Sequence, residues 1–151
     1  MPGAYFGTDI MVGFPGETAA DFDRTRGVFT GHPFALCHVF TFSEREGTPA
    51  AMAADHVPVP ERNRRSAVLR KLAHDRRHDF YARHLGQTLP VLLEDPKPGA
   101  WPGYTDNYIR VMIDAAKVPG PDADLRNRLA RVRLDRVAAD FVEGSLVEMI
   151  D

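Results

Sequence analysis

The chain has 151 residues, of which 44% are hydrophobic and 26% are charged, and its formal net charge is -2. This composition is typical of one ordinary folded domain or two small ones, and the near-balanced charge excludes a general attraction to nucleic acid or anionic lipid. No apolar run is long enough to span a membrane, and the first residues lack the pattern of a secretory signal. We therefore expect a cytoplasmic protein with no membrane partner and no DNA partner. The single cysteine, Cys37, excludes an internal disulfide and cannot hold an iron-sulfur cluster by itself.

The first part of the chain has the pattern of a strand, a helix and a second strand. Residues 10–12 form an apolar run without polar alternation, which is typical of a strand covered on both faces in a parallel sheet. Thr18 and Asp21 form a capping-box pattern that begins a helix, and residues 31–33, Gly-His-Pro, are expected to end it. Residues 36–42 form the second predicted strand. The unit predicted is therefore a parallel βαβ.

Both loops that follow the predicted strands lie at the carboxyl ends of those strands. In parallel α/β sheets and barrels this edge binds ligands, so residues 13–16 and 42–50 are candidate ligand loops on one rim. Two parallel strands leave open edges and do not make a fold, so we expect this segment to need further strands.

The residues of the two loops resemble a known family. Two stretches are similar to the late barrel of the radical SAM methylthiotransferases. The first is Thr8-Asp9-Ile10-Met11-Val12-Gly13-Phe14-Pro15-Gly16-Glu17-Thr18. The second is His38-Val39-Phe40 followed by Ser43-x-Arg45-x-Gly47-Thr48-x-Ala50. These enzymes insert a methylthio group into a modified tRNA adenosine or a ribosomal protein aspartate. The His-Val-Phe stretch is most similar to the branch that acts on N6-threonylcarbamoyladenosine in tRNA.

The resemblance implies a binding wall for S-adenosylmethionine. Its residues are Ile10, Val12 and Gly13, which offer an apolar surface and a close backbone approach, and Ser43 and Arg45, which offer polar groups. The alternative is structural, because Ile10 and Val12 would look the same in any buried strand. Taken together, the motifs favour the cofactor interpretation.

The chain departs from the family in one respect that bears on activity. Radical SAM chemistry needs a Cys-x-x-x-Cys-x-x-Cys loop for a 4Fe-4S cluster, and this sequence has no such loop. We expect neither the cluster nor S-adenosylmethionine to bind stably to this chain alone, and we assign no catalytic residue and no metal ligand. Because the sequence starts where the family would already be inside the barrel, we expect a truncated or mis-started product whose partner is the missing N-terminal portion of the enzyme.

Residues 58–85 form a predicted helix that is strongly basic. It begins near Pro60, ends at Gly86, and carries eight arginines and lysines among residues 61–83 against three acidic residues. Arg62, Arg64 and Arg65 are candidate contacts for an RNA phosphate backbone. An equally weighted alternative is a solvated helix face with ordinary ion pairs.

Residues 86–151 alternate between apolar and polar residues with a period of two. The alternating sets are Leu89, Val91 and Leu93, then Ile109, Val111 and Ile113, then Ala130, Val132 and Leu134, with a final strand at 145–150. Turns are predicted at 95–99 with 101–103, at 118–121 and at 143–144. Short strands with this punctuation predict a small all-β barrel.

The stretch Gly103-Tyr104-Thr105-Asp106-Asn107-Tyr108-Ile109-Arg110-Val111 resembles the signature of the TRAM domain, an OB-like RNA-binding barrel found in the same enzymes. Aromatic side chains beside arginines stack bases and neutralise phosphates. The candidate RNA contacts in the barrel are therefore Tyr104, Asn107, Tyr108, Arg110, Arg131 and Arg133. The structural alternative is that the tyrosines cover the barrel end.

The sequence thus predicts an α/β plus all-β chain in three segments. These are the C-terminal part of a radical SAM TIM-like barrel (1–57), a basic connecting helix (58–85) and a TRAM RNA-binding β-barrel (86–151). The function expected is that of a portion of a tRNA methylthiotransferase, inactive alone, with tRNA as its partner. The alternatives are a standalone, non-catalytic RNA-binding module and a fragment whose N-terminal portion does not fold stably.

Overall fold

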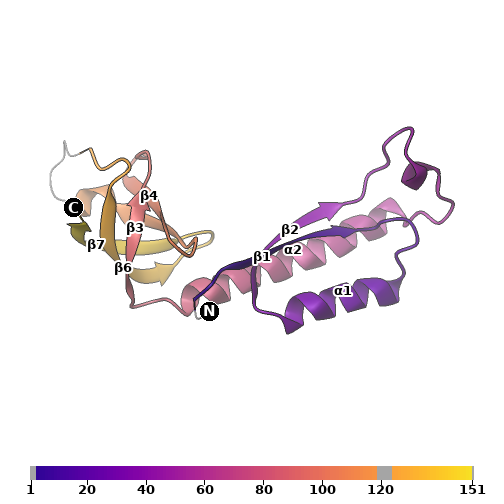
Figure 1. Cartoon of the computed structure of the whole chain (residues 1–151), viewed down its shortest axis with the longest axis horizontal. Coiled ribbons are helices and arrows are strands. Elements are labelled where there is room, and N and C mark those ends of the chain that lie inside the picture. Colours follow the sequence, from indigo (N-terminus) through magenta and orange to yellow (C-terminus); the bar gives the residue numbers. More distant parts are fainter. Residues whose placement is uncertain (1–2, 119–123, 151) are drawn as a thin grey trace. The chain divides into compact units, whose positions relative to one another are not determined.

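The computed structural model describes residues 3–118 and 124–150. They divide into two compact units (Figure 1), one spanning Tyr5–Arg77 and the other comprising residues 78–150 with residues 3–4. The boundary falls inside the long helix α2, Val59–Ala82, which supplies residues to both units. The division of the sequence into segments 1–57, 58–85 and 86–151 stays a prediction.

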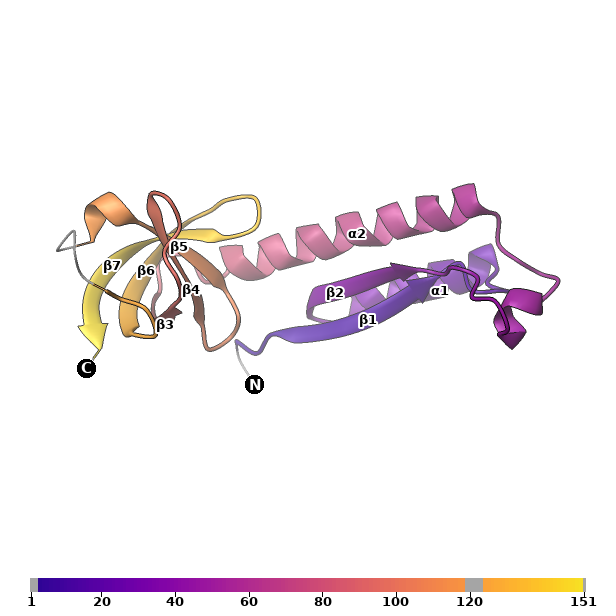
Figure 2. The ribbon, with the colours of Figure 1, turned by 90° about the horizontal axis from the view of Figure 1, so that it is seen from above.

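The first unit is built on two parallel strands joined by a helix. β1 (Phe6–Val12) and β2 (Phe34–Thr41) pair in parallel, with Ile10 opposite Val39 and Val12 opposite Thr41, and α1 (Ala19–Gly31) connects them. Figure 2 shows the two strands side by side and pointing the same way. The predicted strand, helix and parallel strand are confirmed, and so is the prediction that both following loops leave the same end of the sheet.

The first turn of α1 is held by the capping box that the sequence predicts. Asp21 N donates to Thr18 Oγ1 at 3.2 Å, and Thr18 N donates to Asp21 Oδ2 at 3.0 Å. The hydrogen bond that Thr18 Oγ1 donates to Asp21 Oδ2, the one from Thr18 N and one from Arg24 lower the pKa of the Asp21 carboxyl to about 2. The cap satisfies amide donors that have no partner within the helix.

Both helices of this unit pack on the same face of the two-stranded sheet. Phe22 of α1 and Leu69 of α2 are buried against Val12, and Ile10 and Val39 pack beside them. The opposite face is open, because Met11 and Phe40, which lie opposite each other in the register, are about half exposed. The prediction that the strand at residues 10–12 is covered on both faces is therefore wrong for the described chain, since the apolar run includes one residue on the uncovered side.

The loop after β2 leads into α2 through a short helix. This helix, η1 (Pro49–Met52), begins after Thr48, whose side chain accepts from Ala51 N at 3.2 Å. α2 then begins at Val59 with Pro60 in its first turn, as predicted, and the chain leaves it before Gly86, which has a φ of +79°.

The second unit contains a closed barrel of five strands. The strands follow one another around the barrel in the order β3-β4-β5-β7-β6, and β3 also pairs with β6. β5 and β7 are parallel and the other pairs are antiparallel. The strands are β3 (Thr88–Leu93), β4 (Ala100–Thr105), β5 (Arg110–Asp114), β6 (Leu129–Val137) and β7 (Val142–Ile150), with a short helix η2 (Ala115–Lys117) after β5. This architecture is compatible with the OB-like barrel predicted.

The interior of the barrel is filled by the alternating residues that the sequence singled out. Val91, Leu93, Ile109, Val111, Ile113, Ala130, Val132 and Leu134 are all buried. The alternation with a period of two buries these side chains and leaves their neighbours along each strand facing water.

One strand was not predicted. Residues 101–103, predicted as part of a turn, lie inside β4, where Gly103 pairs with both Leu93 and Val111. A Cβ at Gly103 would lie 2.5 Å from the carbonyl oxygen of Leu92. Glycine here therefore permits a close approach of two strands rather than a turn.

A second turn prediction is also wrong. Residues 143–144 lie in β7, and the turn before this strand is instead closed by a hydrogen bond of 2.8 Å from Ala138 N to Phe141 O. Gly144 again marks close packing, because a Cβ would meet Val132 Cγ1 at 2.5 Å. The turn predicted at residues 118–121 lies largely outside the described residues.

Candidate cofactor pocket and nucleic-acid interface

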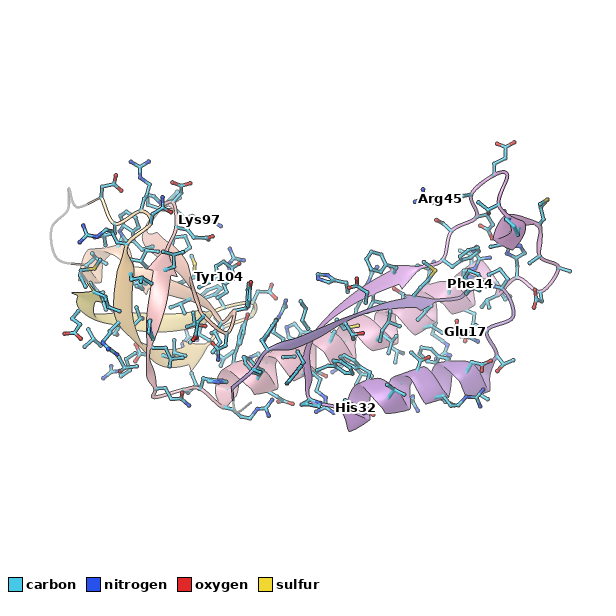
Figure 3. The ribbon with its side chains drawn as sticks, in the orientation of Figure 1. Phe14, Glu17, His32, Arg45, Lys97 and Tyr104 are labelled. Atoms are coloured by element: carbon cyan, nitrogen blue, oxygen red, sulfur yellow. The ribbon has the colours of Figure 1, made fainter. Side chains whose placement is uncertain are left out.

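A pocket of about 370 Å³ lies beside the carboxyl ends of β1 and β2, on the open face of the sheet. Figure 3 marks Phe14 and Glu17 in the loop after β1 and Arg45 in the loop after β2. The rings of Phe14 and Phe42 meet edge to face with their centroids 5.2 Å apart. The pocket is lined by Met11, Phe14, Phe40, Thr41, Phe42, Ser43, Arg45, Thr48 and Ala50. Aromatic and aliphatic walls with a few polar groups suit a nucleoside-sized ligand.

Two of the five predicted cofactor residues line this pocket. Ser43 and Arg45 do so, whereas Ile10 and Val12 face the helices in the core. Gly13 is buried with Arg62 against it, since a Cβ at Gly13 would lie 2.4 Å from Arg62 Cγ. The predicted apolar wall residues Ile10 and Val12 thus lie on the face of β1 away from this pocket. Because successive side chains of a strand alternate, the residue presented to the pocket is Met11.

Arg62 of α2 anchors the loop that follows β2. Its Nε donates to Val57 O at 2.6 Å, its Nη1 to Phe42 O at 3.3 Å and its Nη2 to Glu44 at 2.5 Å. The hydrogen bond from Arg62 lowers the pKa of the Glu44 carboxyl to about 2. One side chain thus fixes both ends of the loop whose first residues line the pocket.

Arg65, one turn further along α2, anchors the loop that follows β1. It donates to the carbonyl oxygen of Glu17 at 2.9 Å and forms an ion pair with the Glu17 carboxylate, also at 2.9 Å. That carboxylate accepts a hydrogen bond from Gly13 N. Glu61 completes the arrangement by accepting from Arg65 at 2.8 Å.

These contacts involve two of the three arginines of the predicted basic RNA patch on the helix. Arg62 and Arg65 are only 4% and 5% exposed and make their hydrogen bonds within their own unit, so they do not face solvent where a phosphate would bind. Arg64 is exposed and pairs with Glu61, as the alternative of a helix face with ordinary ion pairs expects. The sequence does not reveal this because arginine suits both a phosphate and an internal carboxylate.

The turn between β4 and β5 presents two exposed tyrosines of the predicted RNA site. Tyr104 is the residue before the last of β4 (Figure 3), and Tyr108 lies at the tip of the turn with a φ of +59°. The side chain of Asn107, also a predicted RNA contact, makes hydrogen bonds within its own unit. It accepts from Thr105 Oγ1 at 2.6 Å and donates to Gly3 O at 3.1 Å, so it shapes the turn.

The three predicted arginines of the barrel differ in their pairing. Arg131 lies 3.1 Å from Glu148, and Arg133 lies 2.7 Å from Asp135. Within residues 3–118 and 124–150, Arg110 has no carboxylate partner, and its Nε is buried without a hydrogen bond. Arg110 is therefore the predicted contact whose positive charge is not balanced by a described neighbour.

The described residues contain no group of three or more histidine, cysteine or acidic side chains that could hold a metal ion. Cys37 is half-buried in β2, and burial raises the pKa of its thiol. None of the described helices is both long enough and apolar enough to cross a membrane.

The sequence of this chain is similar to those of several known enzymes. The chain is 37% identical over 138 residues to a tRNA-2-methylthio-N(6)-dimethylallyladenosine synthase of Maricaulis maris. It is 28% identical over 156 aligned residues to the threonylcarbamoyladenosine tRNA methylthiotransferase MtaB of Bacillus subtilis, and 38% identical over 113 residues to that of Rickettsia prowazekii. The chain is a homologue of the methylthiotransferases. The resemblance seen in the two loop motifs is thereby confirmed.

The match covers 91%, 100% and 75% of this chain but only 29%, 33% and 26% of those three methylthiotransferases. The chain thus spans about a third of their length. No family model matches it. Among solved structures, a multidomain protein with nucleic acid binding domains from Streptococcus pneumoniae is 16% identical over 46% of this chain and 27% of its own, with a TM-score of 0.36.

Proposed function

We propose that this chain is part of a tRNA methylthiotransferase, in which the first unit supplies one wall of the cofactor pocket and the barrel contacts the tRNA. The observation that supports this most is the homology to methylthiotransferases along nearly the whole chain. On this proposal the two strands belong to a TIM-like barrel, the five-stranded barrel is a TRAM domain, and the enzyme acts in the cytoplasm, where its tRNA is.

In an intact enzyme of this family, S-adenosylmethionine together with an iron-sulfur cluster supplies the methyl group and the radical. Ser43 and Arg45 fit the polar part of such a ligand, and Met11, Phe14 and Phe40 fit its apolar part, because all five line one pocket. Arg62 and Arg65 act through the loops, which they hold in place. The cluster fits no residues here, since the sequence has one cysteine and the described residues no metal-binding group. Its ligands must come from the rest of the enzyme.

The modified adenosine we propose as substrate is N6-threonylcarbamoyladenosine. The His-Val-Phe lead into the second loop supports this choice, and relatives named for that nucleoside match this chain. Relatives named for the dimethylallyl nucleoside match as well, so the two substrates are to be separated by mass spectrometry of the methylthio nucleosides that the enzyme forms in tRNA.

Binding to tRNA is testable with the 151-residue chain itself. We expect the chain to bind unmodified tRNA with an affinity that falls as salt rises, because phosphate contacts release counterions. Arg110→Gln should weaken binding, and it should reduce the slope of log affinity against log salt concentration by about one unit, the loss expected for one phosphate contact. Arg126→Gln is the matched control, because Arg126 is already paired with Asp124 at 2.7 Å.

A chain that binds no tRNA at low salt would contradict the proposed function of the barrel. An equal loss of tRNA affinity in Arg110→Gln and Arg126→Gln would contradict the assignment of Arg110 as a phosphate contact. A standalone RNA-binding module, the second candidate, also predicts tRNA binding, but it predicts no activity when the chain is joined to the rest of a relative.

A further inference from the structure

We infer that the barrel binds unpaired nucleotides on a row of side chains that crosses its outer surface from β5 to β6, with the bases packed on Tyr104, Leu92 and Leu129 and a phosphate near Arg110. This inference rests on the proposed binding of tRNA and says which part of an RNA the barrel takes. Leu92 and Leu129 belong to no motif of the sequence.

The strand register places these side chains in one line. Arg110 pairs with Tyr104, Tyr104 with Leu92, and Leu92 with Leu129. Residues paired across neighbouring strands point to the same side of a sheet, so all four lie on the outside of the barrel. With strands about 4.8 Å apart, the apolar part from Tyr104 to Leu129 spans about 10 Å, which suits about two splayed bases.

The apolar character of this line is unusual for the outer face of a small barrel. Leu92 and Leu129 are 46% and 44% exposed, although they alternate with the buried interior residues Val91, Leu93 and Ala130. Outward positions on such strands are ordinarily polar. Adjacent exposed leucines beside an exposed tyrosine therefore form a patch that a flat apolar surface would cover favourably.

The charges around the line favour a nucleic acid over an apolar peptide. Arg110, at one end, has no described carboxylate partner, so a phosphate oxygen would balance its charge. Arg131 follows Leu129 by two residues on the same face and is paired with Glu148 at 3.1 Å. Glu94 and Asp106 are exposed on opposite sides of the row, because each follows a row residue by two positions and β3 and β4 run antiparallel, and they oppose further phosphate tracks there. One cation beside an apolar strip suits single-stranded RNA, whose bases are free to stack.

The test compares a single-stranded RNA of eight nucleotides with its own duplex, both titrated into the 151-residue chain. Leu92→Thr and Tyr104→Thr should each weaken binding of the single strand about tenfold, as expected for the loss of one stacked base. Val147→Thr is the matched control, because Val147 is an exposed aliphatic residue of β7 outside the row. The duplex should bind weakly and be indifferent to all three substitutions.

A second measurement does not depend on variants. In the unmodified chain, the methyl resonances of Leu92 and Leu129 should shift on addition of the single strand, whereas those of Val147 should not. Resonance shifts confined to other methyl groups would overturn the inference. Equal losses of affinity for the single strand and the duplex in the variants would overturn it as well. If tRNA binding responds to Arg110→Gln but not to the row variants, the inference fails and the proposed function stands. If no RNA binds at all, both fail.

Discussion

Arg65 on α2 lies 2.9 Å from the carboxylate of Glu17, which comes 48 residues earlier in the chain. Both side chains are almost entirely buried, and the same carboxylate accepts from Gly13 N at the end of β1. One turn earlier on the helix, Arg62 holds Phe42 and Glu44 in the loop after β2. Two arginines therefore fix the two loops that line the pocket.

The first prediction concerns this pairing. Arg65→Met should lower the free energy of unfolding of the first unit by about 3 kcal/mol, because it leaves the Glu17 carboxylate buried without its partner. Arg64→Met is the matched control and should change stability by about 0.5 kcal/mol or less, since the Arg64–Glu61 pair is exposed at Arg64. Urea unfolding followed by circular dichroism at 222 nm measures both.

Trp101, the single tryptophan, lies in β4, so its fluorescence reports on the barrel in the same samples. The urea concentration at the midpoint of the Trp101 fluorescence transition should not change when Arg65 is replaced. Equal stability of the Arg65→Met and Arg64→Met proteins would show that the buried pair does not hold the loop.

The second prediction concerns acid pH. The pKa of Glu44 falls from an ordinary value of 4.5 to about 2, chiefly through the hydrogen bond from Arg62, and that of Glu61 falls to about 2 through its bonds to Arg64 and Arg65. A lowered pKa means that the unfolded chain binds more protons between about pH 4.5 and 2. The stabilisation is therefore complete above that window and is lost as the pH falls through it.

Glu44→Gln isolates this effect, because glutamine resembles the protonated acid. The loss of stability caused by the substitution should be largest at pH 7 and should shrink steadily between pH 4.5 and 2. A difference that stays constant across this range would show that the Glu44 carboxyl titrates normally in the folded protein.

The third prediction concerns Gly103. Gly103→Ala should destabilise the barrel by about 2 kcal/mol, because the new methyl group would lie 2.5 Å from the Leu92 carbonyl oxygen and 2.6 Å from Val91 Cγ1. Trp101 fluorescence during urea unfolding measures the change.

Gly27→Ala provides a contrast of opposite sign, since Gly27 lies in α1 and a Cβ there meets no described atom within 4 Å. It should stabilise the first unit by about 1 kcal/mol, as seen at 222 nm. A tolerated Gly103→Ala would mean that β3 and β4 are less tightly paired.

Local patterns predicted the elements of this chain well where one periodicity was clear. The capping box at Thr18 and the alternation through Val111 and Val132 each correspond to an element in the structure. Prediction failed at Gly103 and Gly144, because a glycine in a close strand pair has the same sequence signature as a glycine in a turn.

The candidate sites were predicted less well, because they depend on tertiary contacts that a single sequence does not show. Periodicity shows that Ile10 and Met11 face opposite ways, but not which of them meets the helices. A basic helix shows its charge, but not that Arg62 and Arg65 would find carbonyl and carboxylate partners from distant loops. Leu92 and Leu129 become neighbours only through strand pairing, so no local pattern marked them.

The most direct test of the central proposal is a chimera of the Bacillus subtilis relative in which this chain replaces its homologous third. The chimera is expressed in a strain that lacks its own enzyme, and the tRNA nucleosides are then measured by mass spectrometry. The proposal predicts that the methylthio derivative of N6-threonylcarbamoyladenosine reappears, and that it declines when the chimera carries Arg110→Gln. A methylthio derivative of the dimethylallyl nucleoside instead would contradict the proposed substrate. A folded, cluster-containing chimera that forms no methylthio nucleoside would contradict the proposal that this chain is part of such an enzyme.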